Sequence, residues 1–442
     1  EAPPLPSTWR DAPVGATIPV TDWWRSFNDP TLNQLVDEAL RDGPTIQIAA
    51  SRVREARALS WATVTQFLPQ LLATGSGQYS RVVESDAPIV GDREEMTGAY
   101  GVQGSWELPL FGIGPAAAGA GASNRGALAD WRGAQVALAA DVAQAYVDLR
   151  AANASHAALT RSIEVSDELA RILGISVRAG FASEADAADA RRLAESSRTR
   201  LPGLVIEQRR AENVLAVLRG RAPGTDDPVL QAAFADASAS VPHLEIASAP
   251  AAPADLLRLR PDVARAEANT LVAAATLGAA RADLLPRLNL PGSINVTDAL
   301  IGSPAGAGTT LATGTPFISI PLFDWGRRFA VSRQRDAQFD QSLIQYRLTV
   351  IQAIAEASNA LVALDQGRLR LVSARAAQDA AGVTARGSRA AFDAGIQSLS
   401  DRLRAEQQLI DAELTRIDAE AQAARAAIAT YRAFGGGPAL TE

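Results

Sequence analysis

Hydrophobic and polar positions follow two different periods along this chain. Four short stretches alternate, with an apolar residue at every second position, and this is the period of a β-strand. Elsewhere apolar residues recur at spacings of three and four, which is the period of a helix in a coiled-coil seam. The alternating stretches are 71–80, 100–110, 288–297 and 317–322. The pattern predicts a mainly helical chain that carries two pairs of strands.

The helical stretches are long. No proline lies between Pro115 and Pro202, so the stretch 113–178 predicts one helix on the order of 100 Å in length. Pro30 and Pro261, each next to an aspartate, are typical of helix starts. The other helices are expected at 31–67, 184–219, 260–284, 326–392 and 398–434.

The two halves of the chain resemble each other in sequence. Residues 180–183 (GFAS) match residues 395–398 (GIQS), and residues 106–111 (WELPLF) match residues 318–323 (ISIPLF). These matches keep their order at a nearly constant offset, which chance matches would not do. We interpret the chain as one ancestral unit used twice.

The repeat divides the chain into segments of different kinds. In chain order they are an N-terminal equatorial segment with the first helices (1–66), the first β-hairpin (67–112), the helical hairpin of the first repeat (113–220), an inter-repeat linker (221–259), the helix of the second repeat (260–284), the second β-hairpin (285–325), the second helical hairpin (326–434) and a C-terminal tail (435–442).

The length of the strands suits a membrane. Each has roughly ten residues, about what a tilted strand needs to cross the hydrocarbon core. Four strands cannot close a barrel, because the smallest transmembrane barrels have about eight. An open sheet in lipid would leave unpaired backbone groups at its edges, each costing several kcal/mol. Copies of the chain are therefore expected to share one barrel.

A cyclic trimer with four strands from each chain would close a 12-stranded barrel, and the long helices would continue it as a tube. The loops within the strand pairs, 82–98 and 298–314, are rich in small and polar residues, as exposed loops of outer-membrane barrels are. The alternative is a soluble sheet that caps a periplasmic coiled-coil scaffold or adaptor. Stability of a monomer without detergent would favour that alternative.

Composition removes most enzyme classes. The chain has no lysine and no cysteine, and its only histidines are His156 and His243. Walker A loops, Schiff-base lysines, thiolate metal sites and Cys-His pairs are thus excluded, and we expect no catalytic residue, cofactor or metal. The net charge of -7 argues against nucleic acid as a partner. No run of 18 or more uncharged apolar residues occurs, so no transmembrane helix is expected.

Several stretches, spread over nearly the whole chain, resemble the outer-membrane factor family, the TolC-like channels, and especially its OprM-like efflux branch. They are 24–32 (WRSFNDPTL), 106–112 (WELPLFG), 256–263 (LLRLRPDV) and 431–437 (YRAFGGG). The resemblance implies a homotrimer in the Gram-negative outer membrane, with a β-barrel, a long periplasmic helical barrel and an equatorial domain.

The resemblance also implies a function. The trimer would be a passive exit duct that works with a periplasmic adaptor protein and an inner-membrane efflux pump to expel drugs or other toxic solutes. Type I protein secretion is the sister role and stays open, as does the cargo. The chain departs from the branch in two places: it carries no lipid-bearing cysteine at its start, and it has Arg404 where the family often has an aspartate.

Charged residues cluster near the two helix–helix turns and form the candidate periplasmic gate. Rings of these side chains, three copies each, would close the tip through ion pairs and bias ion passage. The alternative is a solvated helical face, whose exposed pairs contribute about 0–1 kcal/mol each. The candidate gate residues are Asp186, Asp189, Asp401, Arg402, Arg404 and Glu406.

The turns themselves resemble the family's motif that meets the adaptor. The candidate docking residues are Arg178, Gly180, Ser183, Gly395 and Ser398, and both glycines also fit plain helix C-caps. Tyr79 and Trp106 are expected at the membrane girdle, in contact with outer-membrane lipid. Trp23, Trp24 and Trp61 are expected in the core.

Overall fold

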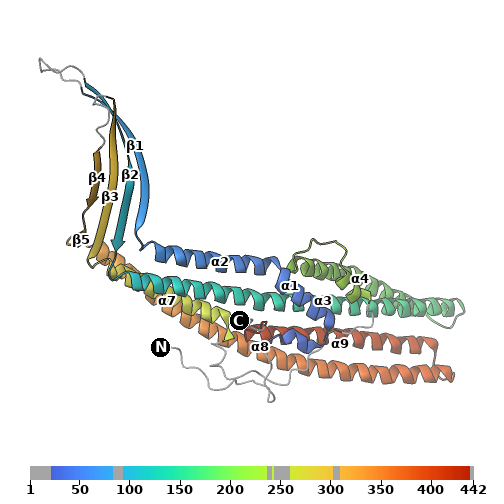
Figure 1. Cartoon of the computed structure of the whole chain (residues 1–442). Coiled ribbons are helices and arrows are strands. Elements are labelled where there is room, and N and C mark those ends of the chain that lie inside the picture. The colour runs from blue at the N-terminus through green and yellow to red at the C-terminus, as the bar shows by residue number, and fades with distance from the viewer. Residues whose placement is uncertain (1–20, 83–92, 236–240, 243–258, 302–308, 439–442) are drawn as a thin grey trace. The chain divides into compact units, whose positions relative to one another are not determined.

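The computed structural model describes residues 21–82, 93–235, 241–242, 259–301 and 309–438 (Figure 1). Parts of both strand-pair loops (83–92 and 302–308), much of the linker with His243, and the end of the C-terminal tail lie outside the described residues. The chain forms two compact units. The helical unit comprises Glu1–Ser51, Ala129–Ala264 and Arg347–Glu442, and the sheet unit comprises Arg52–Leu128 and Arg265–Tyr346.

An antiparallel sheet dominates the sheet unit. Its strands lie in the order β1-β2-β3-β4, and β5 also pairs with β3. The fourth strand, expected at 317–322, is strand only at 317–319 (β5), and part of the expected loop 298–314 forms a further strand (β4). Pro316, which has no N–H to donate to the ladder, lies between the two. The strands are β1 (Gln70–Val82), β2 (Arg93–Leu108), β3 (Arg287–Ile301), β4 (Thr309–Gly314) and β5 (Phe317–Ser319).

The register gives this sheet one apolar and one polar face. Residues directly opposite each other share a face, so Tyr100 lies between Gly75 and Val296, and Gln103 lies between Leu72 and Ser293. The apolar face carries Leu71, Ala73, Tyr79, Met96, Tyr100, Val102, Trp106, Leu288, Leu290, Ile294, Val296, Ala312 and Ile318. The polar face carries mainly Ser, Thr, Gln and Asn, and no strand residue whose side chain is described is buried on either face.

The helices match the predicted lengths with one difference. The expected helix 31–67 is two helices, because Gly43 adopts the extended conformation that a residue before proline prefers and Pro44 begins a new helix. A short helix also lies in the predicted linker. The helices are α1 (Pro30–Asp42), α2 (Pro44–Thr65), α3 (Ile113–Arg178), α4 (Glu184–Leu218), α5 (Pro228–Ala235), α7 (Pro261–Ala282), α8 (Arg327–Asp393) and α9 (Leu399–Ala433), preceded by the 3-10 helix η1 (Trp23–Phe27).

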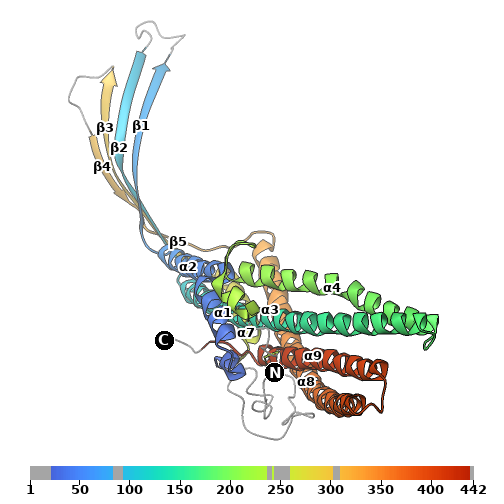
Figure 2. The same ribbon diagram turned by 90° about the vertical axis from the view of Figure 1, so that its right-hand side faces the viewer.

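In the helical unit, α4, α3, α9 and α8 lie side by side in that order in both views (Figure 1, Figure 2). Ion pairs join α3 to α9. As the residue number of the partner on α3 rises, that of the partner on α9 falls by nearly the same amount, so the two helices are antiparallel in a fixed register. The pairs are Asp148–Arg425, Arg161–Glu413 and Asp141–Arg432, at 2.7, 2.8 and 3.3 Å.

The N-terminal part packs on the ends of the long helices. The indole of Trp23 stacks on Tyr431 with ring centroids 4.8 Å apart, and burial raises the pKa of Tyr431 to about 12. Trp23 and Trp24 are fully buried, as expected. Trp61 is 70% exposed on α2, so its placement in the core was wrong. Leu59 and Val64 beside it on α2 are exposed too, so among the described residues this part of α2 packs against no core of the chain.

One helix, α8, is long and apolar enough to cross a membrane by length and composition alone, with a mean hydropathy of 1.2 over an 18-residue window. The expectation of no such helix was therefore too strict, because it allowed no charge in the window. Only 33% of the window is buried. This is weak evidence for a membrane span, since an alanine-rich helix with one unpartnered apolar stripe meets the same criteria.

Candidate functional site

The two helix–helix turns have the same backbone structure. In the first, the N–H of Phe181 donates to the carbonyl of Ser176 and that of Gly180 to Val177, at 2.8 and 3.0 Å. In the second, Ile396 donates to Ala391 and Gly395 to Phe392, at 2.8 and 2.9 Å. Both patterns are Schellman motifs, whose left-handed position favours glycine, and φ is 79° at Gly180 and 72° at Gly395. The sequence repeat is thus a structural repeat.

Each turn is followed by a serine that caps the next helix. The hydroxyl of Ser183 accepts the N–H of Asp186 at 3.1 Å, and the hydroxyl of Ser398 accepts that of Asp401 at 3.2 Å. Each serine hydroxyl also donates to the aspartate carboxylate, at 2.7 and 2.6 Å. Hydrogen bonds from Ser183 hold the pKa of Asp186 below its usual value, and the Arg404 charge adds to the effect. Two of the six candidate gate residues therefore have a capping role in each single chain.

The other candidate gate residues are placed differently. Asp189 pairs with Arg192 at 2.9 Å, one turn further along α4. Arg404 lies 3.5 Å from Asp401 on its own helix, and its positive charge also acts on Asp186 of the other hairpin. The Arg402 guanidinium lies over the ring of Phe392, 5.4 Å from its centroid, and Glu406 is half-buried. Asp186, Asp401 and Arg404 thus gather where the two hairpins meet, whereas Asp189 and Arg402 bind neighbours in their own hairpin.

A small apolar core joins the hairpins just behind the turns. Leu403 of α9 packs there with residues of α3 and α4, and a polar layer separates this tip core from the main core. In that layer the amide of Gln407 donates to Ser162 at 2.7 Å and accepts from Ser166 at 3.2 Å. Both serines are about 1% exposed, and Ser162 also contacts the Ser197 hydroxyl at 3.3 Å. The tip core is therefore a distinct cluster, which Val165 joins to the main core by packing against both.

The candidate docking residues lie at the surface of the tip. Arg178, Gly180, Ser183, Gly395 and Ser398 are all exposed. The residue after each glycine is large and apolar, and Phe181 is 88% and Ile396 79% exposed. In a Schellman motif this residue frequently packs back on its own helix. Sequence analysis missed both side chains, although the repeat places them at equivalent positions.

The candidate girdle residues lie on the apolar face of the sheet. Tyr79 pairs with Met96 and is exposed, and Trp106 pairs with Leu290. The indole N–H of Trp106 donates to the carbonyl of Phe67 at 2.8 Å, so this tryptophan is half-buried at the sheet's base.

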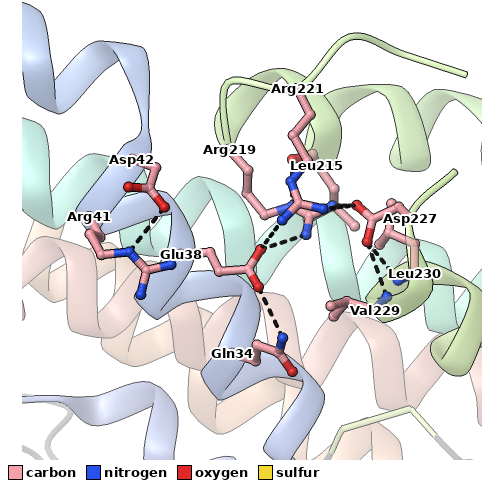
Figure 3. A network of polar contacts seen from close by, with 10 residues as sticks. All are labelled: Gln34, Glu38, Arg41, Asp42, Leu215, Arg219, Arg221, Asp227, Val229 and Leu230. Atoms are coloured by element: carbon pink, nitrogen blue, oxygen red, sulfur yellow. Dashed lines mark hydrogen bonds and ion pairs between the residues drawn. The ribbon is translucent and has the colours of Figure 1, made fainter. Parts of the chain in front are cut away.

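A buried charge network fixes the other end of α4 (Figure 3). Arg219 follows α4, and its guanidinium contacts Asp227 and lies 2.9 Å from Glu38 of α1. Arg221 reaches the same two carboxylates, at 3.0 Å from Glu38 and 3.3 Å from Asp227. Asp227 also accepts backbone N–H groups at the start of α5. The network ties α1 and α5 to the end of α4.

Among the residues that the structure describes, no group of three or more histidines and carboxylates could hold a metal ion. The clusters found here are capping, packing and ion-pair arrangements. Such contacts can hold the two helical hairpins together at the tip or release them, and none of these clusters presents a general base to a cavity.

Several known outer-membrane and efflux proteins are similar to this chain. The chain is 29% identical to the outer membrane protein OprJ of Pseudomonas aeruginosa, over 99% of this chain and 91% of OprJ. It is 28% identical to the cation efflux system protein CusC of Escherichia coli, over 94% of this chain and 88% of CusC. The solved structure of the outer-membrane channel OprN matches with a TM-score of 0.82 at 28% identity, covering 99% of both chains.

The family described as outer membrane efflux protein matches residues 35–221 and 252–436, which together are most of the chain and correspond to the two repeats. This family consists of efflux channels and not of enzymes. The chain therefore belongs to the outer membrane efflux protein family and is an exit duct of the Gram-negative outer membrane with a long periplasmic extension.

Proposed function

We propose that three copies of this chain close one duct for small toxic solutes, which a periplasmic adaptor protein and an inner-membrane pump supply. The observation that carries the trimer is the sheet. It is a single layer with an uncovered apolar face, and its edges at β1 and at β4 and β5 have no partner among the described strands. Lipid can cover the apolar face, but only another strand can satisfy the edges.

The helical unit supports the same assembly. Its outer helices, α4 and α8, each carry an apolar stripe on the side away from the rest of the unit. On α8, Ile351, Val362 and Leu369 are exposed at spacings of 11 and 7 residues, which keep them on one face of the helix, and on α4, Ile206 and Val217 are exposed 11 residues apart. Pairing α4 of one copy with α8 of the next makes a heterologous contact, which closes into a ring.

The test is mass and conductance in detergent. We expect the purified protein to require detergent, to have the protein mass of a trimer, and to form pores in planar bilayers. A stable monomer in aqueous buffer would contradict the proposal. A trimer without conductance would support the assembly and contradict only an open duct.

We also propose that the tip is the periplasmic gate. Asp186, Asp401 and Arg404 lie where the hairpins meet, and in a trimer three copies of this cluster would surround the pore end. Charge rings of this kind bias ion passage. Arg404 can pair with the aspartate of its own helix or with that of the other hairpin, so separation of the hairpins exchanges one carboxylate for the other.

Gate function is tested with Asp401→Ala combined with Arg402→Ala. We expect higher single-channel conductance or more frequent opening, because the closed tip loses contacts. The matched control is Asp418→Ala with Arg370→Ala, an exposed pair at 2.7 Å that joins α9 to α8 away from the tip. Unchanged conductance in a correctly assembled tip variant would remove these residues from the gate.

The exposed turns suit a protein partner. The five candidate docking residues belong to the same two turns as Phe181 and Ile396, whose side chains present apolar surface at the tip of the helical unit. We assign this surface to the adaptor. The remaining partner is outer-membrane lipid, against Tyr79 and Trp106 on the apolar face, and no nucleic acid is expected from a net charge of -7.

The cargo class is inferred from relatives. One is the toluene efflux pump outer membrane protein TtgI of Pseudomonas putida, 27% identical over 94% of this chain. We infer small organic solutes as cargo. Expression together with a matching pump and adaptor, in a strain that lacks its own duct, is expected to restore resistance to such solutes. Restoration of protein secretion instead would favour the type I role.

A further inference from the structure

The polar face of the sheet is hollowed towards one end. The hollow has a volume of about 530 Å³, and most of the side chains that line it belong to the polar face of β1, β2, β3 and β4. A volume of this size suits a small organic molecule. The polar side chains of this hollow, which we call the basal hollow, are Gln70, Gln103, Ser105, Ser293, Thr313 and Thr315.

Hydroxyl and amide groups dominate the polar face at and beyond the basal hollow. The side-chain amide of Asn295 donates to the hydroxyl of Ser293 at 3.1 Å, and that hydroxyl lies 2.9 Å from the hydroxyl of Thr313. No polar-face position is charged over the stretches 70–80, 97–105, 289–297 and 309–313. The basal hollow therefore offers hydrogen bonds and carries no net charge of its own.

Charge gathers at the rim of the basal hollow. Glu107 lies on the polar face of β2, two residues beyond Ser105, and Asp283 follows α7. The guanidinium of Arg287 binds both carboxylates, at 2.7 Å from Glu107 and 2.5 Å from Asp283. Both carboxylates are about half exposed, at 53% and 52%. Because two carboxylates share one guanidinium, this group of three retains one negative charge in each chain.

An aromatic ring lies in the same row as one of these carboxylates. Asn289 pairs with Glu107 on one side and with Phe317 on the other, so the three side chains share the polar face. Neighbouring strands are about 4.8 Å apart, which separates the backbones of Glu107 and Phe317 by roughly 10 Å. The Phe317 side chain is 51% exposed. An accessible ring face attracts cations, and so does the carboxylate beside it.

We propose that the basal hollow and its rim form a site that organic cations occupy as they pass through the duct. The cationic group of the solute lies between Glu107 and the Phe317 ring, and the rest of the solute lies in the hollow, where Gln103 and Ser293 offer hydrogen bonds. Anions are disfavoured because the rim retains negative charge.

This inference rests on the proposed duct, because the polar face lines a lumen only when lipid covers the apolar face. It narrows the proposed cargo from small organic solutes to those that carry a positive charge. Three copies of the chain would place three such sites at one height of the lumen.

The test compares two probes of similar size and opposite charge on the trimer's pores in planar bilayers. We expect benzyltrimethylammonium to reduce the ionic current in a concentration-dependent way, and benzenesulfonate to have no such effect at the same concentrations. Glu107→Gln keeps an oxygen for Arg287 but removes the charge, so it is expected to raise the half-blocking concentration about two- to fivefold. Phe317→Leu is expected to raise it by a similar factor, about two- to fivefold, because the ring face is lost.

The opposite change is expected from Arg287→Gln. This variant leaves both carboxylates without their cation, so the half-blocking concentration of benzyltrimethylammonium falls, which damage to the structure alone would not produce. Glu94→Gln is the matched control. Glu94 lies on the same strand as Glu107 but on the apolar face, where it pairs with Arg81 at 3.8 Å, and its variant is expected to block as the wild type does.

Two outcomes overturn the site and leave the duct standing: equal block by the two probes, or equal half-blocking concentrations in wild type and Glu107→Gln. A trimer that forms no pores contradicts the proposed duct, and the site falls with it.

Discussion

At the scale of single residues, Arg219 is an enclosed charge between two carboxylates. Its side chain has 0% exposure, and the partners come from α1 and from the start of α5. A buried ion pair is weak evidence of net stabilisation, but removing one partner leaves the other charge without compensation, at a cost of about 3–5 kcal/mol. Arg221 also reaches both carboxylates and offsets part of that cost.

We therefore expect Arg219→Met to lower the free energy of unfolding by about 3 kcal/mol. Denaturant unfolding of the solubilised protein measures it. Arg192→Met is the control, because Arg192 and its partner Asp189 are both exposed, and its effect is expected within about 0.5 kcal/mol. Equal losses in the two variants would contradict the proposed role of burial. Neutralising Glu38 and Asp227 together in the Arg219→Met chain is expected to recover part of the loss.

Single residues differed in how far the sequence could predict them. The Ser-x-x-Asp spacing after both turns is a capping signature, so the capping role of Asp186 and Asp401 was readable, although we assigned them only to the gate. Arg219 could not be predicted, because Glu38 lies far from it in sequence. The left-handed conformation of Trp325, with a φ of 57°, could not be predicted either, because nothing in the alternation of the second hairpin indicates it.

At the scale of elements, the polar layer at Gln407 interrupts an otherwise apolar coiled-coil core. Buried polar groups at seam positions specify register in coiled coils. Here Gln407 of α9 satisfies Ser162 and Ser166 of α3, in line with the ion pairs that fix the same antiparallel register. The layer also separates the tip core from the main core, so it is the natural place for the tip to move as a unit.

Gln407→Ala is expected to lower the stability of the tip by about 1–3 kcal/mol, because buried Ser166 loses its side-chain partner and buried Ser162 keeps only the Ser197 hydroxyl. Hydrogen exchange measured on peptides from the C-terminal end of α3 and the N-terminal end of α4 is expected to accelerate, while exchange in the main core stays unchanged. Gln422→Ala is the control, since this glutamine of the same helix binds exposed Arg370 and Asp418. Faster exchange throughout the helical unit would mean that the tip is not a separate unit.

Helices and strands could be predicted where the spacing of apolar residues keeps one period along the whole element. The alternation of the strands also assigned the two faces of the sheet, because the register pairs like residues across β1, β2 and β3. The single helix expected at 31–67 was wrong, because the extended conformation of Gly43 before Pro44 ends α1 and a new helix begins at Pro44. The short α5 depends on its Asp227 cap and on the contact of that cap with Arg219, which no local pattern shows.

At the scale of the whole molecule, the single chain leaves the same kind of surface at both ends of its helical row. The helices α4 and α8 lie at opposite edges in both views (Figure 2). Their outward stripes are apolar and exposed, while the apolar side chains inside the row are buried in one core and ion pairs join the helices at its surface. A second copy that pairs α4 with α8 buries both stripes and leaves no free edge after three copies.

The absence of cysteine makes this pairing directly testable, because introduced thiols have no competitors. Val217 and Val362 are exposed on α4 and α8 and lie at similar distances from their tip turns, on the order of 30 residues along each helix. Copies related by rotation about the duct axis keep these heights. Val217→Cys with Val362→Cys is therefore expected to form disulfides between copies, and denaturing gels are expected to show covalent dimers and trimers.

Val217→Cys with Val383→Cys places the thiols at different heights and is expected to stay monomeric on the same gel. If the first pair also runs as a monomer while the native trimer forms, another pair of helices makes the contact between copies.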